Sequence, residues 1–195
     1  MTVASGRRLH RTAGFTLLEI VIVMVMIATL VAVVVPRLNA PRYRVDAAIQ
    51  MFRNALTQAQ RTALINQYDV IVVIDTVNEA LKVSEDANND GLIESTEHSQ
   101  NFPLTDGLAF VVPPVGLDSM VSVPVVGSQL GRLGSLPTIT FRRDGAASSD
   151  LQLYIATPAT PSRIYRALQL VQSTGRSDWY LYNSTANIWT LGGLR

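Results

Sequence analysis

The sequence predicts an α+β fold in which a long N-terminal helix packs on an antiparallel β domain. Three features support this prediction. Residues 15–35 form an almost unbroken apolar run. Apolar residues then recur at helical spacing between residues 45 and 63. Beyond residue 67, short runs rich in β-branched and aromatic side chains are separated by turn-forming residues. Helices that precede the strands, instead of alternating with them, favour α+β.

The composition limits the classes of function. The chain has 195 residues, which one membrane segment and one globular domain would fill. Cysteine is absent, which excludes disulfides, thiolate metal ligands and cysteine nucleophiles. The net charge of +1 gives no argument for a nucleic-acid partner or an acidic substrate. The predicted parts are a leader over 1–14, a transmembrane and assembly helix over 15–38, and a globular domain over 39–195.

The start of the chain has the pattern of a membrane segment behind a basic leader. Arg7, Arg8 and Arg11 precede the apolar run, and the leader holds no acidic residue. As a helix, 15–35 spans roughly 32 Å, enough for a hydrocarbon core of about 30 Å. The positive-inside rule puts the leader in the cytoplasm. A secretory signal would have a shorter apolar core, and an uncleaved anchor would not explain Glu19, a carboxylate inside the run.

The apolar run begins with a short motif, because residues 14–19 read Gly-Phe-Thr-Leu-Leu-Glu. Together with the basic leader and the apolar run, this motif resembles the processing site of type IV prepilins and type II secretion pseudopilins. The resemblance implies that a prepilin peptidase cuts between Gly14 and Phe15 and then methylates Phe15. It also implies that the helix stays in the mature protein, with a kink at Pro36.

The same resemblance gives Glu19 a role in filament assembly. After cleavage the amine of Phe15 is cationic and Glu19 is anionic, and neither group finds water inside lipid. Pairing between neighbouring subunits would offset much of the cost of burying these two charges, and it would set the stagger of the filament. The implied partners are the prepilin peptidase, other major or minor pilins or pseudopilins, and inner-membrane lipid before assembly.

The rest of the chain predicts an amphipathic helix and then strands. The helix is expected over about 43–66, and its buried face is expected to contain Val45, Ile49, Phe52, Leu56, Ala59 and Ala63. Strands are expected over 70–75, 80–84, 108–112, 138–142, 151–155, 166–171, 179–183 and 188–191. The segment 111–137 is rich in Pro, Gly and Ser, which predicts a long irregular loop. This order of elements resembles the pilin fold.

Two later motifs resemble one branch of the family, the GspH/FimT-type minor pilins. Residues 139–145 read Ile-Thr-Phe-Arg-Arg-Asp-Gly, and residues 173–176 read Ser-Thr-Gly-Arg. Members of that branch carry a strand with a phenylalanine before an Asp/Asn-Gly turn, and later strands that end in Thr-Gly-Arg. Taken alone, the Asp-Gly pair at 144–145 predicts a hairpin turn, which is also its role in the family.

The segment 86–97 has the spacing of an EF-hand calcium loop. Calcium prefers oxygen ligands, and a bound ion would be structural rather than catalytic. The residues before the segment predict a strand instead of a helix, and the same residues also suit a solvated turn, so both interpretations remain open. The expected ligands are the side chains of Asp86, Asn88, Asp90 and Glu97, the carbonyl of Leu92, and Glu94 through a water.

Catalytic motifs are missing from the sequence. No P-loop, G-x-S-x-G, H-E-x-x-H or G-x-G-x-x-G pattern occurs. Beyond the leader, the single histidine is His98. We therefore expect a protein that is not an enzyme.

DNA capture is the alternative function, because some FimT-like minor pilins bind DNA for natural transformation through a basic C-terminal motif that starts with Gly-Arg. Arg176 is the matching residue here, but Ser177 and Asp178 follow it where a second arginine is expected. The acid lowers the positive potential that phosphate binding needs. Residues that could supplement this patch are Arg163, Arg166 and Arg195, with Trp179 and Tyr180 as candidates for base stacking.

Together these features predict a minor pseudopilin or minor pilin. It would be a single-pass protein of the inner membrane, with its N-terminus in the cytoplasm and its GspH-like globular domain in the periplasm. From there it would be extracted into the periplasm-spanning filament of a type II secretion system or a type IV pilus, at the tip or in the initiation complex.

Overall fold

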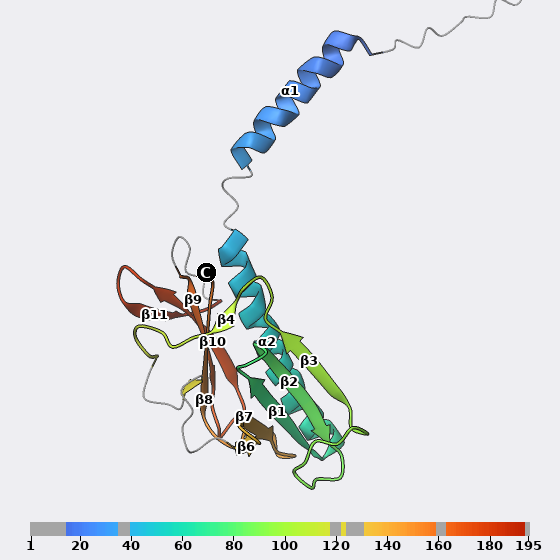
Figure 1. Ribbon diagram of the computed structural model, residues 1–195, viewed down its shortest axis with the longest axis vertical. Coiled ribbons are helices and arrows are strands. Elements are labelled where there is room, and N and C mark those ends of the chain that lie inside the picture. The colour runs from blue at the N-terminus through green and yellow to red at the C-terminus, as the bar shows by residue number, and fades with distance from the viewer. Residues whose placement is uncertain (1–14, 35–39, 118–121, 124–130, 159–162, 194–195) are drawn as a thin grey trace, which may run out of the picture. The chain divides into compact units, whose positions relative to one another are not determined.

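The computed structural model describes residues 15–34, 40–117, 122–123, 131–158 and 163–193. Two compact units divide the chain, Met1–Asn39 and Ala40–Arg195, and each is described by itself. The first contains helix α1 (Leu17–Val34), and the second contains helix α2 (Ala40–Asn66) and the strands (Figure 1). The fold is α+β, as predicted, and its strand pairs are antiparallel apart from β5 with β8.

Helix α1 begins where its sequence supplies a cap. The hydroxyl of Thr16 accepts a hydrogen bond from the N–H of Glu19 (3.2 Å), and the carbonyl of Thr16 accepts one from the N–H of Ile20 (3.2 Å). A threonine followed three residues later by glutamate has the spacing of a capping box, and an acidic residue in the first turn suits the helix dipole. Within the described part of the chain, no helix has both the length and the apolar character needed to cross a membrane.

Helix α2 confirms the predicted amphipathic helix, and it begins at Ala40 instead of near residue 43. Pro41 lies in its first turn, where a missing N–H is tolerated. After the helix ends, Gln67 adopts a left-handed conformation (φ 59°) and donates its N–H to the carbonyl of Ala63 (3.0 Å). The six residues predicted for the buried face are all buried: Val45, Ile49, Phe52, Leu56, Ala59 and Ala63.

The first sheet has the strand order β3-β2-β1-β7-β6. Its strands are β1 (Asp69–Asp75), β2 (Ala80–Asp86), β3 (Ser99–Pro103), β6 (Gly131–Leu133) and β7 (Leu136–Phe141). At the β1–β2 turn, the carboxylate of Asp75 accepts the N–H groups of Val77 (3.0 Å) and Asn78 (2.8 Å). The hydrogen bond from the Asn78 backbone lowers the pKa of Asp75, so this turn keeps an ionised carboxylate as its acceptor.

The second sheet has the strand order β11-β10-β9-β8-β4, and β5 pairs with β8 in parallel. Its strands are β4 (Ala109–Phe110), β5 (Ser122–Val123), β8 (Leu151–Ala156), β9 (Tyr165–Leu170), β10 (Ser177–Asn183) and β11 (Ile188–Leu191). All six residues of β8 are buried, because both faces of this strand are covered.

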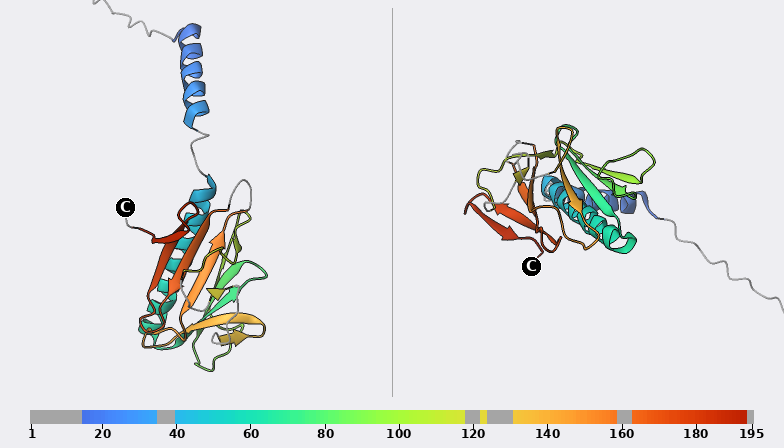
Figure 2. Two further views of the ribbon diagram at one scale, coloured as in Figure 1. Left: turned by 90° about the vertical axis from the view of Figure 1, so that its left-hand side faces the viewer. Right: turned by 90° about the horizontal axis from the view of Figure 1, so that it is seen from below.

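The hydrophobic core lies between α2 and the sheets. Helix α2 packs against strands of both sheets (Figures 1 and 2). Phe52 of α2 stacks on Phe110 of β4, with ring centroids 5.8 Å apart. The core cluster is drawn entirely from residues 45–179. The second unit therefore contains a core of its own.

Several strands differ from the sequence prediction. Strand β3 lies where no strand is predicted, because its residues are mostly polar and exposed and it ends in proline. The predicted loop 111–137 contains β5, β6 and the start of β7, and the predicted strand 108–112 is only the two residues of β4. Strands β4, β5 and β6 are too short for their sequence alternation to be recognised.

Candidate functional site

The predicted assembly helix exposes apolar side chains on every side. Phe15, the predicted mature N-terminus, is 80% exposed, while Gly14 lies outside the described residues. A helix that is apolar all round is normally covered by a large core or by lipid. None of its described side chains belongs to the core cluster. Its exposed large apolar residues are Leu17, Leu18, Ile20, Val21, Ile22, Val23, Met24, Val25, Met26, Ile27, Leu30 and Val31.

Glu19 holds the one acidic side chain of α1, and that side chain is exposed. Its backbone N–H is capped by Thr16, a local role that the sequence analysis missed although the Thr-x-x-Glu spacing signals it. Among the ion pairs of the described residues, none involves the Glu19 carboxylate. The charge of Glu19 is therefore available to a group from outside this helix.

The first half of the 86–97 loop is folded around two aspartates. Asp86, at the end of β2, is only 2% exposed, and its two carboxylate oxygens accept the N–H groups of Asp90 (3.1 Å) and Gly91 (2.8 Å). The side-chain oxygen of Asn88 also accepts the N–H of Asp90 (3.1 Å), and Asp90 accepts the N–H of Leu92 (2.8 Å). These bonds hold the backbone of a tight turn.

The second half of the loop is held by Glu97, whose carboxylate oxygens accept the N–H groups of Ala87 and Glu94, both at 3.0 Å. The first and last predicted calcium ligands, Asp86 and Glu97, thus both bind backbone amides of the loop. In the described residues, no three Asp, Glu or His side chains form a group able to hold a metal ion. Calcium binding by 86–97 stays a prediction, and it would require these carboxylates to be shared with the ion.

Arg176, the predicted DNA contact, is paired with an acid. Its side chain is 72% exposed, and its Nε and Nη2 atoms lie 2.8 and 2.5 Å from one carboxylate oxygen of Asp178. The two candidates for base stacking are engaged elsewhere: Trp179 packs against the core, and the hydroxyl of Tyr180 donates to Gln169 (2.9 Å). The charge of Arg176 is therefore offset by Asp178, while the exposed Arg53 of α2 lies beside it and donates from Nε to the Ser177 carbonyl (3.2 Å).

The prediction that Arg166 could supplement a basic surface patch is wrong, because this residue is buried. It is 1% exposed, its Nε lies 2.5 Å from a carboxylate oxygen of Asp46 on α2, and its Nη1 donates to the carbonyl of Tyr165 (2.9 Å). Arg166 alternates with Leu168 and Leu170 along β9, so its side chain faces the core. Of the other two residues, Arg163 is exposed and Arg195 lies outside the described residues.

The two motifs of the GspH/FimT resemblance meet at one point on α2. Gly145 (φ 82°) and Gly175 (φ 62°) each form a turn in a left-handed conformation. The side-chain amide of Gln60 donates to the carbonyls of Gly145 (2.8 Å) and Thr174 (2.7 Å). A Cβ on Gly175 would lie 2.3 Å from the Gly145 carbonyl oxygen. These motifs therefore hold two turns against the helix, which is a role in the fold.

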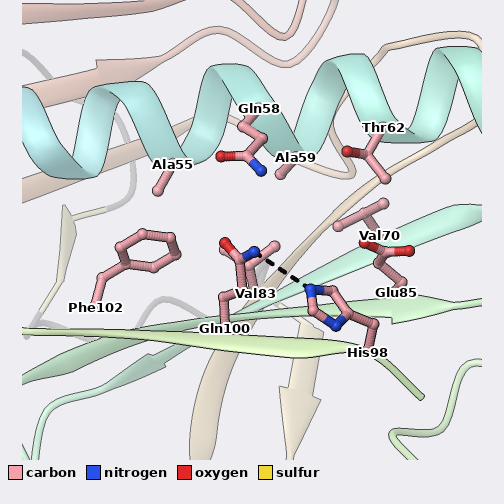
Figure 3. Close-up of a pocket in the computed structure, with 10 residues that line it drawn as sticks. All are labelled: Ala55, Gln58, Ala59, Thr62, Val70, Val83, Glu85, His98, Gln100 and Phe102. Carbon is pink, nitrogen blue, oxygen red and sulfur yellow. Dashed lines mark hydrogen bonds between the residues drawn. The ribbon is translucent and has the colours of Figure 1, made fainter.

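His98 lines a small cavity between α2 and strands β1, β2 and β3 (Figure 3). Its volume is about 20 Å³, enough for a single water. The His98 ring lies 3.3 Å from the side-chain nitrogen of Gln100, and Glu85 accepts a hydrogen bond from the hydroxyl of Tyr68. Burial raises the pKa of Tyr68, and the bond to Glu85 raises it further. The cavity is too small to hold a substrate.

Comparison of the chain with protein-family models, with curated proteins and with solved structures finds no match in any of the three.

Proposed function

We propose that this chain is a minor pilin or pseudopilin subunit with a pilin fold, assembled through α1 into a type IV pilus or a type II secretion pseudopilus. The observation that carries this proposal is the contrast in burial between the two units. Helix α1 exposes apolar side chains all round, while the second unit has a core of its own. At about 25 cal/mol per Å² of apolar surface, burial of α1 against lipid or other helices is strongly favoured.

The proposed pathway begins in the inner membrane. Lipid covers the apolar run 15–35, with the basic leader in the cytoplasm and the second unit in the periplasm. A prepilin peptidase cleaves between Gly14 and Phe15 and methylates Phe15. The mature subunit then enters the filament, where helices of other pilins replace the lipid around α1.

Glu19 supplies the specific step in this assembly. Its carboxylate has no ion-pair partner among the described residues, and a carboxylate among apolar side chains needs one. The methylated amine of Phe15 on a neighbouring subunit is the proposed partner. Because a bare charge inside an apolar contact is costly, only a register that brings the two groups together allows the helices to pack.

The test replaces Glu19 with glutamine in a strain that makes the other filament subunits. Glutamine also satisfies the spacing of a capping box, so Glu19→Gln keeps the start of α1 and removes only the charge. We expect normal cleavage and methylation, seen by mass spectrometry of the N-terminus, together with loss of the protein from sheared filaments. Thr29→Ala is the matched control in the same helix, since among the described residues the hydroxyl of Thr29 bonds to the carbonyl of Met26 alone (2.9 Å).

Three results would contradict the proposal. Incorporation of Glu19→Gln at the level of the unchanged protein would remove the proposed role of the charge. An N-terminus that is not Phe15 in the mature protein would remove the processing step. If Thr29→Ala were lost from filaments to the same degree as Glu19→Gln, assembly would depend on α1 in general and not on the charge of Glu19.

DNA capture through Arg176 is the weaker alternative. The guanidinium is neutralised by Asp178, and Arg166, which could have extended the patch, is buried against Asp46. Phosphate binding depends on clustered, available positive charge. Tight binding of duplex DNA that weakens with salt and is lost in Arg176→Ala would favour this alternative.

A further inference from the structure

Strand β11 leaves one open strand edge in the second unit. β11 is the terminal strand of its sheet and pairs only with β10 (Figure 1). Its four residues carry no charge and include no proline, and Ile188 and Leu191 are 50% and 40% exposed. Charged residues, proline and covering loops are the usual ways in which proteins block such an edge.

Strand β3, one of the two edges of the other sheet, differs in character. Strand β3 is polar along most of its length and ends in Pro103, which has no N–H to donate. Strand β11 has neither a charged residue nor a proline, so it is open to pairing. The difference singles out β11 as an edge on which a further strand can be added.

The hydrogen-bond pattern shows which groups of β11 face outward. The N–H of Gly192 donates to the carbonyl of Trp179 in β10 (2.7 Å), so this pair is hydrogen-bonded. Hydrogen-bonded and non-bonded pairs alternate in an antiparallel ladder. Thr190 therefore bonds to β10, and the backbone groups of Trp189 and Leu191 point away from it. Among the described residues, none bonds to these outward groups.

We infer that the β11 edge pairs with β11 of a second copy of this chain, antiparallel about a two-fold axis at Thr190. In this register Trp189 lies opposite Leu191 of the second copy, and Leu191 lies opposite its Trp189. Both are hydrogen-bonded pairs, so all four outward backbone groups on each copy are used. A contact that uses the same residues on both copies closes on itself as a dimer.

The side chains of β11 fit this register. Two threonines lie directly opposite each other at the axis, a favourable cross-strand pair. Ile188 lies opposite Gly192 of the second copy, whose Cα is covered by the ring of Trp179, so Ile188 meets an apolar surface there. Because the strand has no charged residue, bringing two copies together creates no repulsion between like charges. On the other face Leu191 lies opposite Trp189 of the second copy, whose ring also packs on Tyr154 and Tyr182 of its own chain.

The absence of cysteine from the chain makes the register directly testable by disulfide cross-linking. Thr190→Cys places two thiols in a non-hydrogen-bonded pair, with Cα atoms about 4.5 Å apart, within the range that a disulfide spans. In Ile188→Cys the two thiols lie on opposite sides of the axis and cannot meet. We expect the full-length chain in detergent to form a disulfide-linked dimer with Thr190→Cys and none with Ile188→Cys under mild oxidation.

A second variant tests the edge itself. Leu191→Lys puts a charge on an exposed edge position without disturbing the core, and edge lysines block strand addition. In the Thr190→Cys background it should abolish the cross-link, while circular dichroism remains unchanged. No dimer with Thr190→Cys, or equal dimer with Ile188→Cys, would overturn the inference. The outcome is independent of Glu19, so failure here leaves the proposed assembly through α1 intact.

Discussion

The two helices differ in whether their apolar side chains are covered by the rest of the chain that the structure describes. Helix α2 has one buried face and one exposed face, and strands of the same unit cover the buried one. Helix α1 has apolar side chains all round, and every described one is exposed. Helix α2 therefore serves the stability of its own domain, and the apolar surface of α1 is the reason why we propose partners for it outside the chain. Substitutions in each of the two units therefore test this conclusion.

The largest loss of stability is expected from Asp46→Ala in α2. This change leaves the guanidinium of Arg166, which is 1% exposed, without its counter-charge. Breaking a buried pair in this way costs about 3–5 kcal/mol, measured as the free energy of unfolding in urea. Arg44→Ala is the control, because its pair with Asp106 is about half exposed (53% and 49%) and 3.7 Å long. Its expected cost is about 0–1 kcal/mol, and equal losses would contradict the assignment of Arg166 to the core.

An isoleucine in each helix gives the most direct comparison. Ile49 in α2 is 0% exposed and Ile20 in α1 is 50% exposed. We expect Ile49→Ala to lower the free energy of unfolding of the second unit by about 2–5 kcal/mol, and Ile20→Ala to change it by less than about 0.5 kcal/mol. Urea unfolding followed by tryptophan fluorescence reports on this unit alone, since Trp179 and Trp189 both lie in it. A loss of similar size from Ile20→Ala would mean that α1 contributes to the core after all.

A smaller difference between a variant and its control is expected where the two glycine turns meet α2. Gly175 and Gly134 have nearly the same backbone conformation (φ 62° and 63°), but a Cβ would lie 2.3 Å from a carbonyl oxygen at Gly175 and meets nothing within 4 Å at Gly134. Alanine at either position costs about 1–2 kcal/mol for the left-handed conformation. Gly175→Ala should cost about 1–3 kcal/mol more, because it overpacks the contact. Equal unfolding free energies for the two variants would rule out that close contact.

The smallest effect concerns calcium at 86–97, which we propose as a weak structural site. At ten times the dissociation constant, binding to the folded chain alone adds about 1.4 kcal/mol. We expect calcium to raise the melting temperature, and Glu97→Gln to remove that rise. The variant Glu94→Gln serves as the control, since Glu94 is expected to bind only through water. No rise with the unchanged protein would leave the loop as a turn held by its own hydrogen bonds.

Most of the fold could be predicted because long elements repeat their pattern. The stripe from Val45 to Ala63 gives α2, and the alternating strands of the second half give most of both sheets. Strand β3 could not be predicted, because its polar residues gain their structure by pairing with β2 rather than from any preference of their own. Strands β5 and β6 are too short to show a period.

The predicted sites divide in the same way. The Thr16–Glu19 cap could have been found from its spacing, and so could the core-facing phase of Arg166, which alternates with Leu168. The partner of Arg166 could not, because Asp46 is 120 residues away in sequence. The meeting of the two glycine turns at Gln60 likewise depends on tertiary packing.

The side chain of Gln60 also bears on the order in which the domain forms. Its two acceptors are 85 and 114 residues away along the chain, so both long loops must close before either bond exists. Contacts of this separation slow folding, because the entropy of loop closure is lost before any contact is gained. We therefore expect Gln60 to join the two turns late, after the helix and the hairpins have formed. Interactions made that late act on how long the folded state survives, more than on how fast it is reached.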